Sequence, residues 1–226
     1  MAARADRQAD RRRQILEAAV KVFAEKGFHA SRVGDIAEEA GIAYGLVYHY
    51  FESKEDLLET IFRTTWTEML ARVREVQEAG VPAAEAVRQV SALILRTWRR
   101  DPNLVRVLVR EITRNQHVQQ EIEEITEAMH TLEEIVRRGQ ETGEFRAELD
   151  PRLAAAIFYG ALEEVLSGWV LGQLPDRDED ITRAEQNVVA VLTGGLKNYE
   201  SAVSPGRGSS TPVSGGPTTA GPTGRK

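Results

Sequence analysis

Cysteine is absent from this 226-residue chain, and histidine occurs only four times. Without a thiol the chain can form neither a disulfide framework nor a cysteine-based metal site. Only His130 has a glutamate three residues before it, Glu127, and a carboxylate di-iron bundle needs two such pairs. The sequence also has no glycine-rich phosphate loop and no nucleophile motif. We therefore expect no metal, no cofactor and no enzymatic activity.

Long hydrophobic runs are missing as well. No apolar run approaches the ~20 residues that a membrane-spanning helix needs, and the first residues lack the apolar centre of a signal peptide. We expect a soluble, cytoplasmic protein without a membrane partner. The length is sufficient for one compact domain and a second, small one.

An excess of basic charge is lacking too, since the net charge is −6. Residues 1–13 carry five Arg and two Asp, whereas residues 14–58 carry four basic and eight acidic side chains. Any contact with a polyanion must therefore come from a few well-placed residues. The triplet Arg11-Arg12-Arg13 is either a solvated start of the first helix or an arm that binds a phosphate backbone.

Residues 33–51 have the pattern of two short helices joined by a tight turn. Gly41 stands where a helix end requires a residue that tolerates positive φ. The apolar face of the first helix, at helical spacing, is Val33, Ile36, Ala37 and Ala40. The outward-facing residues of the second helix are Tyr44, Gly45, Tyr48 and His49. This is the pattern of a helix-turn-helix, whose second helix enters the DNA major groove.

The same stretch resembles the TetR family of bacterial transcriptional regulators. The matching residues are Asp35-Ile36-Ala37, Ala40-Gly41, Gly45, Tyr48-His49-Tyr50-Phe51 and Ser53-Lys54-Glu55-Asp56-Leu57. The resemblance covers about residues 10–58 and implies a DNA-binding domain. Ala43 and Leu46 stand where the family usually has Ser or Thr, so the resemblance implies the docking mode but not the details of base reading.

The expected DNA-binding residues surround the second helix. They are Ser31, Arg32, Ala43, Tyr44, Gly45, Leu46, Tyr48, His49 and Lys54. Tyr44 is expected at a base or sugar edge, and Tyr48, His49 and Lys54 at phosphates. The alternatives are that Tyr48 belongs to the core and that His49 is only a solvated ring. Ser31 is also the expected N-cap of the first of the two helices.

Helical periodicity continues along most of the chain, and no stretch has a strand pattern. Nine helices are expected, at about residues 8–26, 33–40, 44–51, 53–79, 82–100, 101–114, 118–141, 150–171 and 181–199. The predicted fold class is all-α, with an N-terminal three-helix helix-turn-helix domain and a C-terminal helical ligand-binding and dimerisation domain. We place the domains at residues 1–58 and 59–200. Residues 201–226 hold six Gly, five Ser, four Thr and four Pro, and this composition predicts a disordered tail.

An arginine cluster marks the segment 96–114, which has six Arg against two acidic residues. Residues 59–200 as a whole have 17 basic and 25 acidic side chains. Arg106, Arg110 and Arg114 recur every fourth residue and so share one helix face. That face is either an anion-binding mouth or a solvated surface paired with nearby acids.

The helix expected at 150–171 is apolar around most of its circumference, so it needs burial on two sides. With the helix at 181–199 it favours the interface of a symmetric homodimer; the alternative is a core helix of a monomer. The expected interface residues are Ala161, Val165, Gly168, Val188 and Leu192.

Residues 104–170 look like the FadR-type branch of TetR proteins, in particular at Leu149-Asp150-x-Arg152-Leu153 and Trp169-Val170. That branch represses fatty-acid degradation genes and releases DNA when a long-chain acyl-CoA binds. The resemblance implies an apolar tunnel for the acyl chain and an arginine-lined mouth for the phosphates of CoA. The expected ligand-binding residues are Trp98, Arg106, Arg110, Arg114, Phe158, Leu162 and Trp169.

The predicted function is therefore a homodimeric repressor that binds a palindromic double-stranded operator and is released by a small-molecule effector, expected to be an acyl-CoA. The alternative is a drug-sensing repressor of an efflux gene. Trp66, Trp98 and Trp169 would suit an aromatic ligand, and Glu163 with Glu164 would suit a cationic one.

Overall fold

The computed structural model describes residues 2–112 and 123–197, and every regular element within them is a helix. The helices are α1 (Ala2–Lys26), α2 (Val33–Glu39), α3 (Tyr44–Tyr50), α4 (Lys54–Glu78), α5 (Ala83–Arg100), α6 (Pro102–Ile112), α8 (Glu123–Glu141), α9 (Pro151–Val170) and α10 (Asp178–Leu196). The all-α prediction is confirmed for these residues. Arg114, the start of the helix expected at 118–141 and the tail at 201–226 lie outside the described residues.

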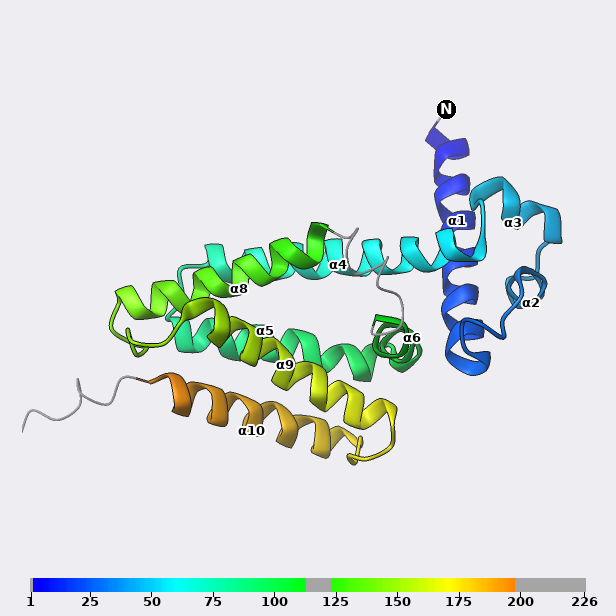
Figure 1. The fold of residues 1–226 in the computed structure, drawn as a ribbon. Helices are drawn as coiled ribbons and strands as arrows, with labels where there is room; N and C mark the ends of the chain where they lie inside the picture. The colour runs from blue at the N-terminus through cyan, green and yellow to red at the C-terminus, as the bar shows by residue number, and fades with distance from the viewer. Residues whose placement is uncertain (1, 113–122, 198–226) are drawn as a thin grey trace, which may run out of the picture.

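Helix α4 is shared by two units. In Figure 1, α1, α2 and α3 form a small unit at one end, and α4 extends from it along the larger bundle of α5, α6, α8, α9 and α10. The boundary predicted at residue 58 falls inside α4, which runs from Lys54 to Glu78. A single rigid helix thus belongs to both units.

Local capping explains where several helices begin. The Asp150 carboxylate accepts a hydrogen bond from the Leu153 amide (2.7 Å), and Asp101 accepts one from Leu104 (2.9 Å). The Ser53 hydroxyl caps α4 by accepting from the Asp56 amide at 3.0 Å. Each of these caps agrees with the sequence pattern, because the short polar side chain satisfies a backbone N–H that has no partner within the helix.

The expectation that Ser31 caps α2 is wrong. The N-cap is Arg32, and the Asp35 carboxylate accepts a hydrogen bond from the Arg32 amide at 2.8 Å. The Ser31 hydroxyl is buried and donates to the carbonyl of Gly27 at 2.6 Å. An acid in the first turn of α2 therefore caps the helix start by accepting from the N-cap amide, and no serine hydroxyl takes part.

Helix α10 begins at Asp178, three residues before the expected start. Its first turn contains Asp178, Glu179 and Asp180. Negative side chains are favourable there because the first turn of a helix carries a partial positive charge. The apolar pattern that we used begins only at Ile181, and the acidic turn before it is part of the same helix.

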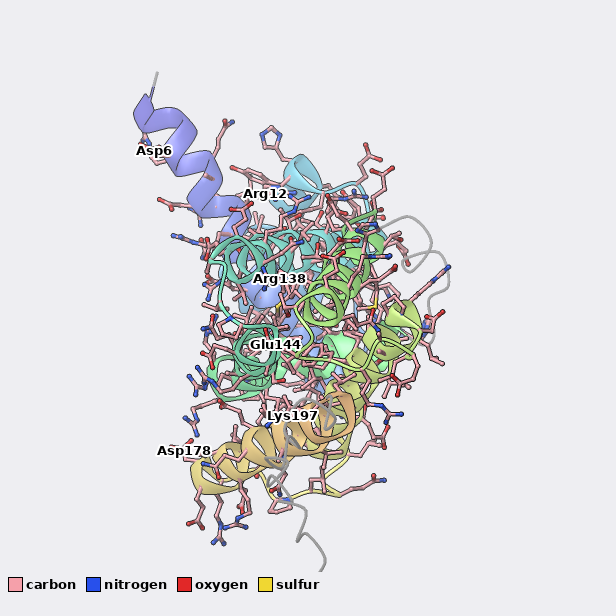
Figure 2. The ribbon with its side chains drawn as sticks, turned by 90° about the vertical axis from the view of Figure 1, so that its left-hand side faces the viewer. Asp6, Arg12, Arg138, Glu144, Asp178 and Lys197 are labelled. Atoms are coloured by element: carbon pink, nitrogen blue, oxygen red, sulfur yellow. The ribbon has the colours of Figure 1, made fainter. Side chains whose placement is uncertain are left out.

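The loop between α4 and α5 is fixed by two side chains from the end of α8 and the turn after it (Figure 2). Arg138 donates to the carbonyls of Gln77 (2.8 Å) and Val81 (3.1 Å). Glu144 accepts from the amides of Ala83 (3.0 Å) and Ala84 (3.2 Å). The α4–α5 hairpin is therefore held at its closed end, and its other end faces α6.

Helix α9 corrects the expectation that no segment is long and apolar enough to span a membrane. Its 20 residues include a window of mean hydropathy 1.3, so the helix is long and apolar enough to cross a membrane, judged by length and composition alone. The helix contacts α5, α6, α8 and α10, and Ala155, Phe158 and Leu162 are buried among them. We interpret α9 as a core helix of the bundle.

Candidate functional site

Two tyrosine rings stand on the exposed side of α3. Tyr44 is 57% exposed and Tyr48 is 46% exposed. Their rings pack edge to face with centroids 5.3 Å apart, and their hydroxyl oxygens lie 3.1 Å apart. This hydrogen bond raises the pKa of Tyr48, so its hydroxyl is neutral at physiological pH. Large aromatic side chains are thus presented to solvent as an ordered pair.

The residues around this pair form what we call the α3 surface: Arg32, Ala43, Tyr44, Gly45, Tyr48 and His49, all exposed. At Gly45, an added Cβ would meet no atom within 4 Å, so the fold itself does not require glycine there. Leu46 is half-buried beside the surface. Of the two interpretations of Tyr48, the structure supports exposure rather than a place in the core.

Lys54 does not lie free at this surface. Its ammonium group donates to the carbonyls of Phe28 (2.8 Å), Ser31 (3.1 Å) and His29 (3.4 Å). It also lies 4.5 Å from the centre of the Phe28 ring. Since an ammonium group has three N–H donors, Lys54 is fully bonded in the free chain, where it clamps the loop between α1 and α2; the phosphate contact stays an untested prediction, and this geometry does not favour it. The buried Ser31 is likewise not available to a ligand.

The arginine triplet at 11–13 is divided among different contacts. The Arg12 guanidinium lies 5.0 Å from the centre of the Phe51 ring, just after α3. Arg13 pairs with Asp10 at 3.0 Å on the exposed side of α1. The cation–π contact holds Arg12 beside α3 and so close to the α3 surface.

An apolar pocket lies between α4, α5, α6 and α9. It has about 670 Å³ of free space, including its open mouth. Its lining residues are Thr65, Trp66, Met69, Ile94, Thr97, Val105, Leu108, Val109, Tyr159, Glu163 and Leu166. Glu163 is the charged residue among them, and burial, followed by the nearby Glu164 charge, raises the pKa of its carboxyl. We call this the effector pocket.

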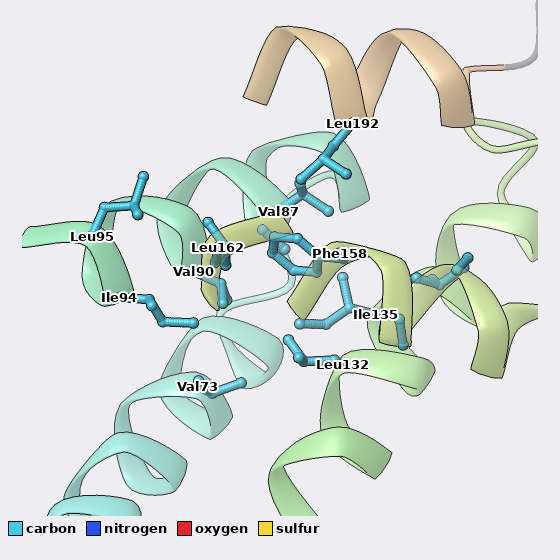
Figure 3. Close-up of a cluster of buried hydrophobic side chains, with 14 of the residues drawn as sticks. Val73, Val87, Val90, Ile94, Leu95, Leu132, Ile135, Phe158, Leu162 and Leu192 are labelled. Atoms are coloured by element: carbon cyan, nitrogen blue, oxygen red, sulfur yellow. The ribbon is translucent and has the colours of Figure 1, made fainter. Parts of the chain in front are cut away.

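The α9 residues expected to bind a ligand do not line this pocket. Phe158 and Leu162 are buried in the bundle core, where they point among Val87, Val90 and Ile135 (Figure 3). The pocket is lined instead by the next residue in each case, Tyr159 and Glu163. One residue along a helix turns the side chain by about 100°, and an almost wholly apolar helix carries no polar stripe that fixes its orientation.

The two tryptophans expected to bind a ligand also lie elsewhere. Trp98 and Trp169 are buried and stack with ring centroids 6.1 Å apart and an interplanar angle of 30°. The Trp169 indole donates to the carbonyl of Pro175 at 3.1 Å, which fixes the turn after α9. Trp66, which we assigned only to the alternative function, does line the pocket.

Arg106 and Arg110 of α6 make separate contacts, and Arg114 lies outside the described residues, so the arginine-lined mouth stays a prediction. Arg106 lies over the Trp98 ring at 5.2 Å and donates to Asn103 at 2.9 Å. Arg110 donates to the Ala24 carbonyl in the last turn of α1 at 3.1 Å. Neither lines the effector pocket. Arg110 instead stabilises the contact between the large bundle and the DNA-binding unit, because a cation is favourable at a helix C-terminus.

Helix α6 touches both units. Val105 and Val109 line the effector pocket. Val107 is buried within the hydrophobic core of α1 to α4, and Leu104 packs against that core. A ligand that displaces α6 would therefore move side chains that contact α1.

A second apolar area is exposed on α9 and α10. Leu153 and Ile157 of α9 are exposed, and Val191 of α10 is 75% exposed. These three residues, with the groove between them, form what we call the α9–α10 face. Large exposed side chains grouped in this way are typical of interaction surfaces.

The residues expected at a dimer interface lie mostly inward of this face. Ala161, Val165 and Val188 are partly buried against the bundle core, and Leu192 is buried in it. At Gly168, a Cβ would lie 2.7 Å from Leu174 of the same chain. Leu192 lines the groove of this face, and Ala161 and Val188 lie one helical turn from Ile157 and Val191 on the same side of α9 and α10, so the predicted interface residues stay a prediction beside the exposed ones.

Two α4 residues of the effector pocket, Thr65 and Met69, were not predicted from the sequence, and Trp66 was predicted only for the alternative function. The available signal was the length of α4, which continues well beyond the part that covers α1. That extension has to pack on something other than the DNA-binding unit.

Comparison with known proteins assigns both units. Residues 15–61 match the family model "Bacterial regulatory proteins, tetR family", and residues 62–195 match "YsiA-like protein, C-terminal region". The chain is 33% identical over 187 residues to the fatty acid metabolism regulator protein of Bacillus subtilis (strain 168), covering 82% of this chain and 95% of that protein. It is 28% identical over 147 residues to the repressor KstR2 of Rhodococcus jostii (strain RHA1), covering 64% and 72%.

Solved structures give the same result. The FadR regulator of Bacillus subtilis in complex with stearoyl-CoA matches with a TM-score of 0.73 at 31% identity, over 81% of this chain and 98% of that one. FadR of Bacillus halodurans matches with a TM-score of 0.74 at 31% identity, over 82% and 96%. These relatives are regulators of transcription and not enzymes.

Proposed function

Since this chain belongs to the TetR family of bacterial regulatory proteins, we propose that it acts as a homodimeric repressor that leaves a palindromic operator when a long-chain fatty-acyl-CoA binds. The observation that carries the ligand half of this proposal is the effector pocket: it is almost wholly apolar, and it shares α6 with the DNA-binding unit. The likeness to a regulator solved with stearoyl-CoA supports the same ligand class. Because the operator DNA of a bacterium lies in the cytoplasm, the proposed location of the protein is the cytoplasm.

The α3 surface is the proposed contact with DNA. Tyr44 stands at the N-terminus of α3, where a recognition helix meets base edges in the major groove. Gly45 follows and has open space around it, so the DNA backbone can approach the helix closely. Tyr48, His49 and Arg32 are the proposed phosphate contacts, which position the helix without reading sequence.

The α9–α10 face is the proposed dimer contact. Ile157 and Val191 are apolar and exposed in the single chain, and a symmetric partner would bury the same face of both copies. Two recognition helices related by that axis would enter major grooves about 34–36 Å apart or a multiple of it.

Release follows from the position of α6. A ligand shifts the protein away from DNA only if it binds more tightly to a conformation in which the recognition helices are wrongly spaced. Val105 and Val109 would contact the ligand. Arg110 is hydrogen-bonded to α1 and Val107 is buried in the core of α1 to α4, so a shift of α6 would also displace α1. We therefore expect α6 to shift relative to α1 when the pocket fills.

The test uses purified full-length protein and operators selected from random double-stranded DNA. Fluorescence anisotropy should show that saturating stearoyl-CoA weakens operator binding by at least about tenfold, within the usual range of allosteric coupling. Stearic acid should release the operator less well. An unchanged operator affinity would reject acyl-CoA as effector, and a selected sequence without twofold symmetry would reject the homodimeric operator complex.

A second candidate function has one observation in its favour. Glu163 places a half-buried carboxyl group in the pocket beside Trp66 and Tyr159, which would suit a cationic aromatic compound. In that case the protein would be a drug-sensing repressor of an efflux gene. Release of the operator by a cationic dye, lost in Glu163→Gln, together with no release by stearoyl-CoA, would favour it.

A further inference from the structure

A polar groove runs along the outer side of the α4–α5 hairpin, close to the effector pocket. Its rim carries four arginines, Arg72, Arg88, Arg96 and Arg100, and we call it the arginine groove. Its other lining residues are the apolar Val76, Ala92 and Leu93 and the polar Gln89 and Glu75, so the groove holds one carboxylate beside four guanidinium groups. It has about 750 Å³ of free space, including its open side.

The sequence of α5 explains the groove. Arg88, Ala92, Arg96 and Arg100 are spaced by four residues, so they share one face of the helix. Ala92 has the shortest side chain of this row and is buried, which leaves a hollow between the flanking arginines. Arg72 reaches the groove from α4 on the other side.

Two of the four arginines are held by ion pairs. Arg96 makes a bidentate contact with Glu185 of α10, with both N–O distances at 3.0 Å. Arg88 donates through Nε to Glu85 at 2.7 Å and, as the largest cause, lowers the pKa of that carboxyl to about 2, so Glu85 is ionised at physiological pH. These contacts orient the two guanidinium groups along the rim.

The positive charges of the other two arginines are not balanced by ion pairs of this kind. Arg72 and Arg100 are exposed, and within the described part of the chain neither has an acidic partner within ion-pair distance. Residues 59–200 contain 17 basic and 25 acidic side chains, so this region of positive charge stands out against an acidic background. Such a groove concentrates positive potential and attracts a polyanion.

The groove and the effector pocket are built on the same two helices. Met69 lines the pocket and Arg72 lines the groove one turn further along α4. On α5, Thr97 lines the pocket between Arg96 and Arg100 of the groove. One helical turn is about 5.4 Å, so a single extended molecule can occupy both.

We propose that the arginine groove binds the phosphorylated nucleotide head of an effector whose apolar chain fills the effector pocket. Each guanidinium group can donate two parallel hydrogen bonds to a phosphate, and the apolar residues at Val76 and Leu93 suit the face of a base. This inference rests on the proposed acyl-CoA function. It gives the phosphate-binding role to the α4–α5 arginines instead of the α6 arginines.

Isothermal titration calorimetry with the full-length protein tests the groove. The double variant Arg72→Ala/Arg100→Ala should bind stearoyl-CoA and CoA alone at least tenfold more weakly than the unchanged protein. Its affinity for stearic acid, which has no nucleotide, should change less than twofold. The salt dependence of stearoyl-CoA binding should also become shallower, because fewer charged contacts remain.

The matched control is Arg74→Ala. Arg74 lies on α4 two residues from Arg72, but it pairs with Glu127 of α8 and does not line the groove. This variant should bind stearoyl-CoA within twofold of the unchanged protein. All the substituted side chains are exposed, and a thermal melt of each variant checks that the fold is intact.

The outcomes separate the two proposals. If the unchanged protein binds stearoyl-CoA and the double variant binds it equally well, the acyl-CoA function stands and the groove proposal is overturned. A loss of equal size in Arg74→Ala would overturn it too, since general charge would then explain the effect. If the unchanged protein binds neither stearoyl-CoA nor CoA, both proposals are overturned.

Discussion

The DNA-binding unit and the larger bundle, which we call the effector unit, differ in how some of their basic side chains are used. In the first, Lys54 clamps a loop, Lys21 pairs with Glu39 and Lys26 pairs with Asp35. What α3 presents to solvent is mainly aromatic. In the effector unit, Arg72 and Arg100 of α4 and α5 stay exposed around a groove. The number of charges in a segment therefore does not locate an anion-binding site; the contacts that each charge already makes decide it.

The two units also differ in their exposed apolar side chains. The α3 surface exposes tyrosines, which can donate hydrogen bonds to a polar partner such as DNA. The α9–α10 face exposes Leu153, Ile157 and Val191, which can only be covered by another apolar surface. The first is suited to a wet, charged partner and the second to a copy of the same chain.

Placing charges on the α9–α10 face should have the largest effect on operator binding. Ile157→Arg with Val191→Arg should give a monomer, because an unpaired charge in an apolar interface is strongly unfavourable. The variant should lose at least about 100-fold in affinity for the full palindrome, since one monomer contacts one half-site. Sedimentation and operator binding measure the two effects.

The control for this prediction is Gln186→Arg, an exposed position on a different side of α10. It should remain dimeric and bind the operator normally. A double variant that stays dimeric with unchanged operator affinity would move the interface to another part of the surface.

Changing the α3 surface should have the next largest effect, and it should depend on the DNA sequence. Tyr44→Ala should weaken operator binding by about 1–3 kcal/mol, as expected for a base contact, and should weaken binding to random DNA much less. His49→Ala should weaken both by similar amounts, as a phosphate contact does. Equal losses on both DNAs for Tyr44→Ala would place that side chain on the backbone.

Removing the Lys54 side chain tests whether its charge stabilises the loop between α1 and α2 or binds DNA. Lys54→Ala should lower stability by about 1–2 kcal/mol, because a half-buried ammonium group loses its bonds to three carbonyls. The slope of operator affinity against salt concentration should not change, since Lys54 makes no phosphate contact in this account.

The matched control is Lys21→Ala, which removes an exposed ion pair and should lower the stability less than Lys54→Ala does. Denaturant unfolding gives the stabilities. A salt slope that becomes shallower by about one unit in Lys54→Ala would restore Lys54 as a phosphate contact.

The smallest expected effect concerns the charge in the effector pocket. Burial raises the pKa of Glu163, so the folded chain binds this proton more readily than the unfolded chain. Its destabilising effect is full above the folded pKa and disappears below the unfolded value of about 4.3. Glu163→Gln should therefore raise the melting temperature by about 1–3 °C at neutral pH.

This gain should shrink as the pH falls toward that unfolded value, because the native carboxyl then becomes neutral as well. Thermal melts of both proteins between pH 4.5 and 8 make the comparison. A constant difference over this range would show that the effect is unrelated to ionisation.

The helices of both units were predictable where the signals are local. Asp101, Asp150 and Ser53 cap helices by contacts within four residues, and the left-handed Gly41 (φ 63°) ends α2 as expected. The role of Lys54 was not predictable, because its partners lie more than 20 residues away in the chain. A lysine at a helix start is as suitable for a phosphate as for a carbonyl until the fold is known.

The orientation of α9 was not predictable for a different reason. Phe158 and Tyr159 are both large and mainly apolar, and so are Leu162 and Leu166, so hydrophobicity does not distinguish the core side from the pocket side. Only the packing against α5 and α8 decides that Phe158 is core and Tyr159 faces the pocket. The arginine stripe of α5 was readable from its spacing, but its neighbour Arg72 comes from another helix.

The central claim is that the effector pocket and the α3 surface are coupled through α6. The most direct measurement is calorimetric titration of stearoyl-CoA into the free protein and into the protein–operator complex. Because coupling between two sites is reciprocal, the operator should weaken stearoyl-CoA binding by the same factor by which stearoyl-CoA weakens operator binding. Equal stearoyl-CoA affinities for the free and the operator-bound protein would contradict the account.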